Sequence, residues 1–362
     1  MTKPRLVIIG PVPPPLHGVA VSTSLLLDSP ILRDAFDVEH LDTSDHRTGR
    51  NVGRWDATNV LVALHAVVSL VRCLRKGRKG IVYLPLSQNT PGFLRDSLFV
   101  WVAHLSGWKV AAHLRGSEFR SAFARSTPLV RRLVKTTLLR MDSIAVMGDS
   151  LRWVFDGLVP RDRIVAIPNG TPEPEILVNG THDHVVFLSN LRRRKGVVEA
   201  VEAALRVHAQ RPSTHFTFAG SWEDDELEAE LRARARPAGD AIRFLKAVDG
   251  TEKDRLLASA TVFLFPPVEP EGHPRVVLEA LAAGAPVVTT DQGAIRETVD
   301  HGKTGFVLGA ADPDSIAVAV LTLLQDEAMR AQFSRAARES YLTRFTPQAA
   351  DERLTAWLQG LV

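Results

Sequence analysis

Residues 266–288 read PPVEPEGHPRVVLEALAAGAPVV and place a loop, a helix and a strand in one short stretch. The loop, 266–274, contains Pro and Gly and leads into an apolar, Ala-rich helix expected over roughly 276–283. Gly284-Ala285-Pro286 then breaks the helix. The residues that follow, Val287-Val288-Thr289, predict a buried strand. The stretch therefore predicts a helix N-terminus directly after a loop, with a buried strand behind the helix.

Two acidic residues of this stretch, Glu271 and Glu279, are expected on the loop just before the helix and about a turn inside it. Free backbone N–H groups of the first helical turn then lie between the two carboxylates and can bind a phosphate. Acidic residues near a helix N-terminus are also favoured by the dipole alone, and most are solvated. However, Glu279 is embedded among apolar residues, where a charge without a partner is costly. The pair suits a ligand with a central diphosphate and hydroxyl groups at both ends, such as a nucleotide sugar.

The rest of the chain alternates strand-like and helix-like segments, which predicts parallel sheets covered on both faces. A turn-rich link around 168–180 separates two such series, so we expect two Rossmann-like halves with the ligand cleft at the carboxyl ends of the strands. The expected strands are Leu6–Gly10, Ile81–Leu84, Val110–Leu114 and Ile144–Met147 in the first half, and Val185–Leu188, Phe216–Ala219, Ile242–Phe244, Val262–Phe265 and Val287–Thr289 in the second.

The composition is that of a globular protein: 45% of the 362 residues are hydrophobic and 23% are charged. At roughly 100–200 residues per domain, this length predicts about two domains. The single cysteine, Cys73, excludes an internal disulfide framework and favours a reducing compartment. We recognise no signal peptide and no apolar run of about 20 residues, so we expect no membrane span.

Basic residues cluster in the first half, although the net charge is only +3. They gather at 72–79 and at 131–140. No nucleic-acid recognition motif accompanies them, so nucleic acid is not expected as a partner. An anionic lipid surface or a lipid-linked phosphate fits this charge better. Cations at a solvated helix end are the simpler alternative.

Three further motifs bear on phosphate, dinucleotide and metal chemistry. In SNLRRRKG, 189–196, Lys195 is a point charge suited to a departing phosphate, whereas three consecutive arginines cannot all face the cleft. The loop GPVPPPLHG, 10–18, is not GxGxxG, which argues against a dinucleotide enzyme. Asp312-Pro313-Asp314 imitates a metal-binding D-x-D, but Pro at the first helical position makes Asp312 an N-cap. We therefore predict no metal.

The first stretch resembles the EX7E motif of retaining glycosyltransferases with the GT-B fold, specifically family four. That family typically reads E-G-F-G-x-x-x-x-E-A, then a small-residue run and G-x-P-V-V; Glu271-Gly272, Glu279-Ala280 and 284–288 match. His273 and Pro274 stand where the family has Phe and Gly. The resemblance implies that Glu271 works at the donor sugar and that Glu279 binds the ribose. Because Pro274 lacks an N–H, the identity of the sugar stays open.

The resemblance also implies roles around the donor diphosphate. Lys195 matches the lysine of the family's G-R-L-x-x-x-K-G, with Asn190 at the family's Arg position. One of Arg192, Arg193 and Arg194 can replace that missing Arg. The helix-start amides of Arg275 and Val276 would hold the diphosphate, beside His273 of the same loop. Glu297 matches the family's G-G-x-x-E on the donor side, although a solvated Glu is nearly as consistent.

In the first half the resemblance concerns two loops. Gly18 corresponds to one member of the family's Gly-Gly pair near the donor diphosphate and the acceptor, with His17 in the partner position. Arg115 stands before Gly116, where relatives often carry a sugar-contacting His. A catalytic contact from Arg115 to a phosphate of donor or acceptor is therefore expected. His113, two residues earlier, is as consistent with a core histidine.

The resemblance covers most of the chain, from about residue 9 to 345, and implies an α/β, GT-B fold. Two Rossmann-like domains would have parallel sheets facing across a cleft. We expect an acceptor domain over 1–170, a nucleotide-sugar donor domain over 171–345, and a C-terminal helix, 346–362, that returns to the first domain.

The implied activity is a retaining, metal-independent glycosyltransferase that moves a sugar from a nucleotide sugar, with UDP favoured, to a hydroxyl acceptor. Surface polysaccharide or lipid-linked glycan assembly would supply the acceptor. No cofactor is expected, because the nucleotide sugar is a substrate. The expected location is the cytoplasm, at the inner face of the membrane, with peripheral contact to anionic lipid through the basic first half. A sugar-nucleotide epimerase of the same fold and a non-catalytic nucleotide-sugar-binding subunit remain alternatives.

Overall fold

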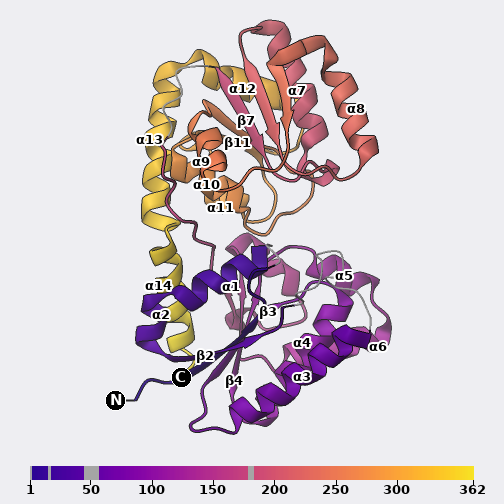
Figure 1. Cartoon of the computed structure of the whole chain (residues 1–362), viewed down its shortest axis with the longest axis vertical. Helices are drawn as coiled ribbons and strands as arrows, with labels where there is room; N and C mark the ends of the chain where they lie inside the picture. Colours follow the sequence, from indigo (N-terminus) through magenta and orange to yellow (C-terminus); the bar gives the residue numbers. More distant parts are fainter. Residues whose placement is uncertain (1, 15–17, 45–56, 178–182) are drawn as a thin grey trace. The chain divides into compact units, whose positions relative to one another are not determined.

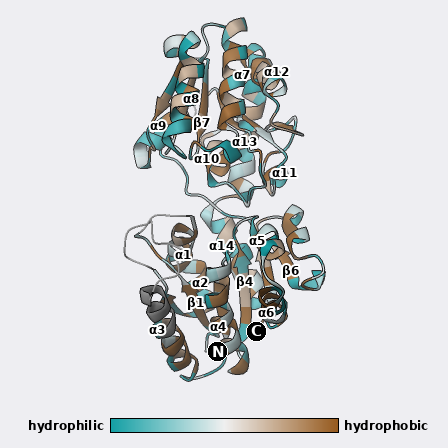
Figure 2. Ribbon diagram, turned by 90° about the vertical axis from the view of Figure 1, so that its right-hand side faces the viewer, coloured by the Kyte–Doolittle hydropathy of each residue, from teal (hydrophilic) through white to brown (hydrophobic). Residues whose placement is uncertain are grey.

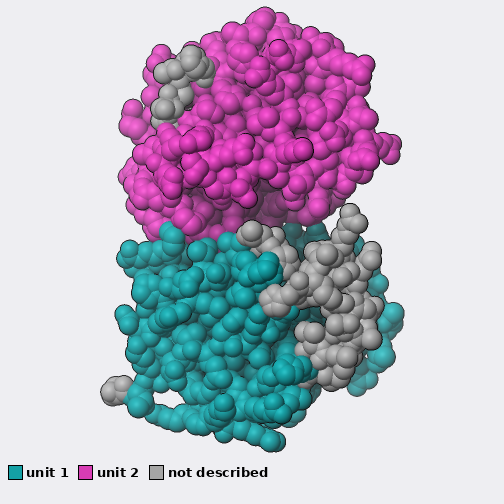
Figure 3. Space-filling model, in the orientation of Figure 1, with its two compact units in different colours: residues 1–168, 347–362 teal, residues 169–346 magenta. Residues whose placement is uncertain are grey.

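The computed structural model describes residues 2–14, 18–44, 57–177 and 183–362. The expected role of His17 and the last residues of the expected turn-rich link, 178–180, lie outside these ranges. The chain divides into two compact units (Figures 1 and 3). Unit 1 is Met1–Pro168 together with Pro347–Val362, and unit 2 is Asn169–Thr346.

Unit 1 contains a parallel six-stranded sheet in the order β2-β1-β3-β4-β5-β6. The order reverses at β1, because β2 pairs with one edge of β1 and β3 with the other. The strands are β1 (Arg5–Gly10), β2 (Asp37–Asp42), β3 (Ile81–Leu86), β4 (Lys109–Leu114), β5 (Ser143–Val146) and β6 (Ile164–Ala166). The helices are α1 (Gly18–Asp28), α2 (Pro30–Ala35), α3 (Ala57–Leu74), α4 (Thr90–Leu105), α5 (Phe119–Arg125), α6 (Pro128–Leu138) and α14 (Pro347–Gln359).

Unit 2 repeats this plan, with a parallel sheet in the order β12-β11-β10-β7-β8-β9. The strands are β7 (His184–Leu188), β8 (His215–Ala219), β9 (Ile242–Leu245), β10 (Val262–Phe265), β11 (Val287–Thr290) and β12 (Gly305–Leu308). The helices are α7 (Val197–Gln210), α8 (Asp225–Ala235), α9 (Gly250–Ala258), α10 (Arg275–Ala283), α11 (Ile295–Thr298), α12 (Pro313–Gln325) and α13 (Glu327–Arg344).

Helices cover both faces of each sheet, and the inner strands are accordingly hydrophobic (Figure 2). In unit 2 the core between strands and helices includes five fully buried phenylalanines, Phe187, Phe216, Phe218, Phe263 and Phe265. The prediction of two Rossmann-like halves with parallel sheets is confirmed. Within the described ranges, no helix combines the length and hydropathy required to cross a membrane.

The C-terminal helix α14 belongs to unit 1, as expected for a helix that returns to the first domain. Its Trp357 ring makes edge contacts with Tyr83 and His113, at centroid distances of 6.3 and 6.2 Å. The indole Nε1 donates to Ser143 Oγ at 2.9 Å. These contacts anchor α14 to three neighbouring strands of the sheet, β3, β4 and β5.

Candidate active site

The strand order of unit 2 places its topological switch point between β7 and β10. From β7 the chain continues to β8 and β9 on one side, whereas β10 and β11 lie on the other side. In parallel α/β sheets, ligands bind outside the carboxyl ends of the strands at such a point. The loop after β7 carries Lys195 and the loop after β10 carries Glu271. The fold thus brings two predicted site residues to the same edge of the sheet.

Lys195 and Glu271 form a direct ion pair. Lys195 Nζ donates to Glu271 Oε1 at 2.5 Å, and the two side chains are only 16% and 13% exposed. In so buried a place either charge alone would be costly, so each neutralises the other. The pair can act chemically in two ways, because the ammonium can bind a ligand phosphate and the carboxylate can then turn towards a sugar.

Two glycines allow the backbone of the site loops to approach closely. Gly196 has φ +75°, and a Cβ there would lie 1.8 Å from the carbonyl oxygen of Pro266. Gly293 has φ +61°, and a Cβ there would lie 1.6 Å from the carbonyl oxygen of Glu271. Only glycine tolerates both the positive φ and the short approach. The loop that carries Glu271 is therefore held between two glycine-bearing segments.

Glu279 lies on α10 and pairs with Lys253 of α9. Lys253 Nζ donates to Glu279 Oε1 at 2.8 Å, and the side chains are 28% and 17% exposed. Arg275 and Val276 begin α10 after Pro274, which has no side-chain cap bond. Arg275 Nη1 donates to the carbonyl of Gly170 at 2.9 Å. The two carboxylates of 266–288 are therefore each paired with a lysine. Glu271 lies on the loop before α10, and Glu279 lies within α10.

The three consecutive arginines have different surroundings. The Arg193 guanidinium binds Glu230 of α8, and its backbone N–H donates to Glu223 at 3.0 Å. The Arg194 carbonyl accepts from the Val268 N–H at 3.0 Å, which ties the Lys195 turn to the Glu271 loop. Arg192 and Arg194 are half-buried, and Asn190 is exposed. Arg193 is thus paired with Glu230 of α8, and the replacement of the family's Arg by one of these three arginines stays a prediction.

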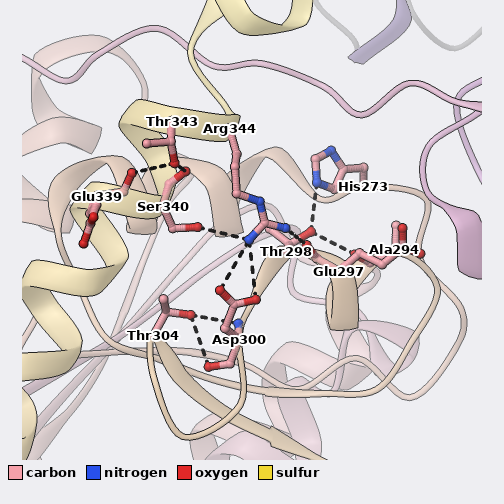
Figure 4. Close-up of polar contacts among 10 residues, drawn as sticks. All are labelled: His273, Ala294, Glu297, Thr298, Asp300, Thr304, Glu339, Ser340, Thr343 and Arg344. Carbon is pink, nitrogen blue, oxygen red and sulfur yellow. Dashed lines mark hydrogen bonds and ion pairs between the residues drawn. The ribbon is translucent and has the colours of Figure 1, made fainter. Parts of the chain in front are cut away.

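His273 and Glu297 lie beside the site in a second polar network (Figure 4). His273 is buried, and both its ring nitrogens are hydrogen-bonded, to Asn169 and Thr298. Glu297 is half-buried on α11, where its backbone carbonyl accepts a hydrogen bond from Arg344. The donor contacts of these two residues therefore remain predictions.

In unit 1, Arg115 follows β4 and is held by a buried tyrosine. Arg115 Nη2 donates to Tyr83 Oη at 3.0 Å, and Tyr83 Oη lies 2.9 Å from His113 Nδ1. Burial, and then the charge of Arg115, hold the pKa of His113 well below 6.5, so its ring is neutral. Gly18 is exposed at the start of α1, with open space where a side chain would extend. His113 is thus a core residue that helps to orient Arg115.

The interpretation of Asp312 as an N-cap is confirmed. Its Oδ2 accepts from the Ser315 N–H at 2.8 Å at the start of α12. Hydrogen bonds from the Ser315 side chain and backbone hold the pKa of Asp312 below its usual value. In the part of the chain that the structure describes, no group of three or more His, Cys, Asp or Glu side chains is placed to share a metal ion.

Comparison with known proteins bears on this site and on the fold. Residues 173–340, almost all of unit 2, match the family described as Glycosyl transferases group 1. The phosphatidyl-myo-inositol mannosyltransferase of Mycolicibacterium smegmatis is 30% identical over 204 residues, which are 54% of this chain and 51% of that protein. The chain therefore spans about half the length of the curated relative that it matches.

Solved structures resemble the whole chain. Anabaena HepE, solved in complex with UDP, has a TM-score of 0.74 at 16% identity and covers 99% of this chain and 100% of its own. Sucrose-phosphate synthase from Thermosynechococcus elongatus has a TM-score of 0.73 at 16% identity and covers 99% of both chains. The chain has the GT-B fold. Unit 1 is the N-terminal Rossmann-like half of this GT-B chain, and unit 2 is the half that contains the family match.

Two residues of these sites were not predicted, Lys253 and Tyr83. The apolar surroundings of Glu279 indicated that its carboxylate needs a partner, but the partner lies on another helix, 26 positions away. Tyr83 is a buried residue of β3, and nothing in its own stretch IVYLPL distinguishes it from a packing residue.

Proposed function

We propose that this chain is a retaining, metal-independent glycosyltransferase that moves a sugar from a nucleotide sugar to a hydroxyl acceptor. The observation that carries the proposal is the pair of lysine–carboxylate contacts: Lys195–Glu271 at the switch point of the sheet, and Lys253–Glu279 between α9 and α10. The match of 173–340 to group 1 glycosyl transferases supports the same reaction class.

In this proposal the donor binds mainly to unit 2. Glu279 binds the ribose hydroxyls, and Lys195 with the helix-start amides of Arg275 and Val276 binds the diphosphate. Glu271 orients the donor sugar and stabilises positive charge near the anomeric carbon. His273, Asn190, Arg194 and Glu297 complete the donor side as lining residues.

Catalysis then depends on positioning and on stabilising the departing diphosphate. Lys195 stabilises the negative charge that develops on the departing diphosphate. Its stabilising interaction is therefore stronger in the transition state than in the donor complex. The acceptor binds to unit 1 at Gly18 and Arg115, and its hydroxyl gives its proton to a phosphate oxygen of the donor. The arrangement needs no resident cofactor, because the donor carries its own leaving group.

UDP is the proposed nucleotide, and the UDP complex of HepE supports this preference. A thermal-shift series with UDP-, GDP- and ADP-sugars tests it, since a ligand at 100 times its Kd adds about 2.7 kcal/mol to the free energy of unfolding. Slow hydrolysis of the stabilising sugar nucleotide should then be lost in Glu271→Ala. Glu269→Gln, an exposed acid of the same loop, is the matched control.

The outcomes of this series separate the alternatives. Stabilisation by no nucleotide sugar contradicts the proposal. Conversion of the donor to an epimer without an acceptor indicates an epimerase. Stabilisation with neither hydrolysis nor transfer to a panel of lipid-linked and soluble glycan acceptors indicates a non-catalytic binding subunit.

We also propose that unit 1 contacts an anionic membrane from the cytoplasmic side, where a lipid-linked or polysaccharide acceptor would be met. Support comes from exposed cations at the end of α3 and on α6: Arg72, Arg75, Lys76, Arg78, Lys79, Arg131, Arg132 and Lys135. Leu129, two residues before Arg131 on α6, is 79% exposed. Sedimentation with vesicles containing anionic lipid, but not with neutral vesicles, is the expected result, and equal sedimentation with both contradicts this contact.

A further inference from the structure

His273, two residues after Glu271, is hydrogen-bonded on both sides of its ring, and Figure 4 shows the side that faces Thr298. The Asn169 N–H donates to Nδ1 at 2.9 Å, and Nε2 lies 2.8 Å from Thr298 Oγ1. Because Nδ1 accepts a hydrogen bond, the ring proton of the neutral histidine is on Nε2, which donates to Thr298. Thr298 Oγ1 donates in turn to the carbonyl of Ala294 at 2.8 Å. The partners on the two sides thus set one tautomer.

These contacts connect His273 to residues next to both boundaries between the units, which lie at 168/169 and 346/347. Asn169 is the first residue of unit 2, and its side-chain Nδ2 also donates to the His273 carbonyl at 3.1 Å. Phe345 lies next to the other boundary, and its ring centroid is 5.6 Å from that of His273. The Thr171 N–H donates to the Phe345 carbonyl at 2.9 Å. We call Asn169, Thr171, His273 and Phe345 the connection cluster.

The same histidine reaches the Glu271 loop through α11. Ala294, whose carbonyl accepts from Thr298, donates its own N–H to the Gly272 carbonyl at 3.2 Å. Gly272 follows Glu271 directly, and Gly293 packs against the Glu271 carbonyl. A continuous set of hydrogen bonds therefore runs from Asn169 through His273 and Thr298 to the residue next to Glu271.

A second contact set holds α11 in place, so that this path has a fixed end (Figure 4). The Arg344 guanidinium binds the Glu297 carbonyl and lies 3.4 Å from both carboxylate oxygens of Asp300. Arg344 is the last residue of α13, one position before Phe345 of the connection cluster. The segment after α13 and the Glu271 loop are thus joined through α11 as well as through His273.

We infer that His273 is a positioning residue that fixes the Glu271 loop to both connections between the units. The inference rests on the proposed function, in which Glu271 acts at the donor sugar. Phe, the residue implied by the resemblance at this position, would fill the space of the ring. Phe would not replace the hydrogen bonds that His273 makes with the Asn169 N–H and the Thr298 hydroxyl. Losing hydrogen bonds of buried polar groups lowers the stability of the folded state. This way of fixing the loop therefore depends on the histidine that this chain carries in place of the family's Phe.

The test compares His273→Phe with His184→Phe as a matched control. His184 is also bonded through both nitrogens, to Thr217 Oγ1 at 2.8 Å and Ser259 Oγ at 3.0 Å. It begins β7, at the opposite end of that strand from the Lys195 turn. Hydrogen–deuterium exchange of the peptide covering 269–275 is the readout that needs no activity. His273→Phe is expected to raise this exchange at least tenfold, and His184→Phe to leave it unchanged.

Turnover of the donor supplies a second readout. His273→Phe is expected to lower kcat at least tenfold while the Kd for UDP changes less than twofold. In a Glu271→Gln background the further substitution His273→Phe is expected to change turnover less than twofold, because His273 acts through Glu271. A merely structural role would give additive losses.

The outcomes distinguish this inference from the proposed function. Unchanged exchange in His273→Phe, or additive turnover losses in the double variant, overturns the inference. Full activity of Glu271→Gln overturns the proposed role of Glu271 instead, and the exchange comparison then still decides the role of His273. If His273→Phe does not fold, Thr298→Val removes only the Nε2 partner and is expected to raise exchange of 269–275 in the same direction.

Discussion

Replacing Lys195 with Met removes the ammonium but keeps a side chain of similar length, so its effect can be separated into two parts. In the protein without ligand, Lys195 Nζ is 2.5 Å from Glu271 Oε1, and the side chains are 16% and 13% exposed. Breaking a buried pair by removing one partner costs about 3–5 kcal/mol. Because both side chains retain some contact with solvent, we expect a loss of stability at the lower end, about 3 kcal/mol.

The second part is the binding of the diphosphate. A hydrogen bond to a charged group contributes about 1.5–3 kcal/mol, so Lys195→Met is expected to weaken UDP binding roughly 10- to 150-fold. Glu271→Gln has the opposite expected sign, because it removes the carboxylate that competes with UDP for Lys195. We expect UDP to bind about three- to tenfold more tightly to this variant, equivalent to about 0.7–1.4 kcal/mol.

Isothermal titration of both variants with UDP and with uridine measures these effects, with Glu269→Gln as the control. Uridine lacks the diphosphate, so its affinity is expected to stay the same in all three variants. Wild-type UDP affinity in Lys195→Met would refute the reasoning. Equal losses for uridine and UDP would show that the substitution disturbs the whole site and not the phosphate contact.

Three further predictions concern single side chains. Glu279→Ala is expected to weaken donor binding by about 1.5–3 kcal/mol, and unchanged affinity of the folded variant would remove the ribose assignment. Gly293→Ala is expected to cost about 3–5 kcal/mol in urea unfolding, because its Cβ would meet a backbone oxygen, whereas Gly302→Ala, also at positive φ but in open space, is expected to cost about 1–2 kcal/mol. Equal costs would exclude the backbone approach as the cause. Because burial lowers the pKa of His113, the unfolded chain takes up a proton below pH 6.5 that the folded protein does not, so stability should fall by up to about 1.4 kcal/mol per pH unit on acidification. His113→Phe should reduce this slope between pH 7 and 5, and an unchanged slope would assign it to other groups.

Most strands could be predicted because they are buried on both faces and read as apolar runs. The three that were not predicted, β2, β6 and β12, lie at the edges of their sheets. All six residues of β2, DVEHLD, are exposed or half-buried, and three of the four residues of β12 are half-buried. An edge strand with solvent on one side carries too few buried positions to give the hydrophobic signal on which the prediction depended.

The site residues were predictable one by one, but their pairing was not. Lys195 and Glu271 each follow a predicted strand, which is a local property of the sequence. Their contact depends on β7 lying beside β10, and this strand order joins residues 76 positions apart. His273 shows the same limit, because its partner Asn169 is 104 positions away and belongs to a turn-rich link. Residue type and spacing thus indicated a phosphate and sugar site, whereas the partners of its charges required the fold.

The central claim is that Lys195 and Glu279 bind different parts of one nucleotide sugar. A crystal structure of the protein with bound UDP tests it most directly. The account predicts a phosphate oxygen within hydrogen-bond distance of Lys195 Nζ and ribose hydroxyls on the Glu279 carboxylate. UDP bound elsewhere, or bound with its ribose away from Glu279, would contradict it.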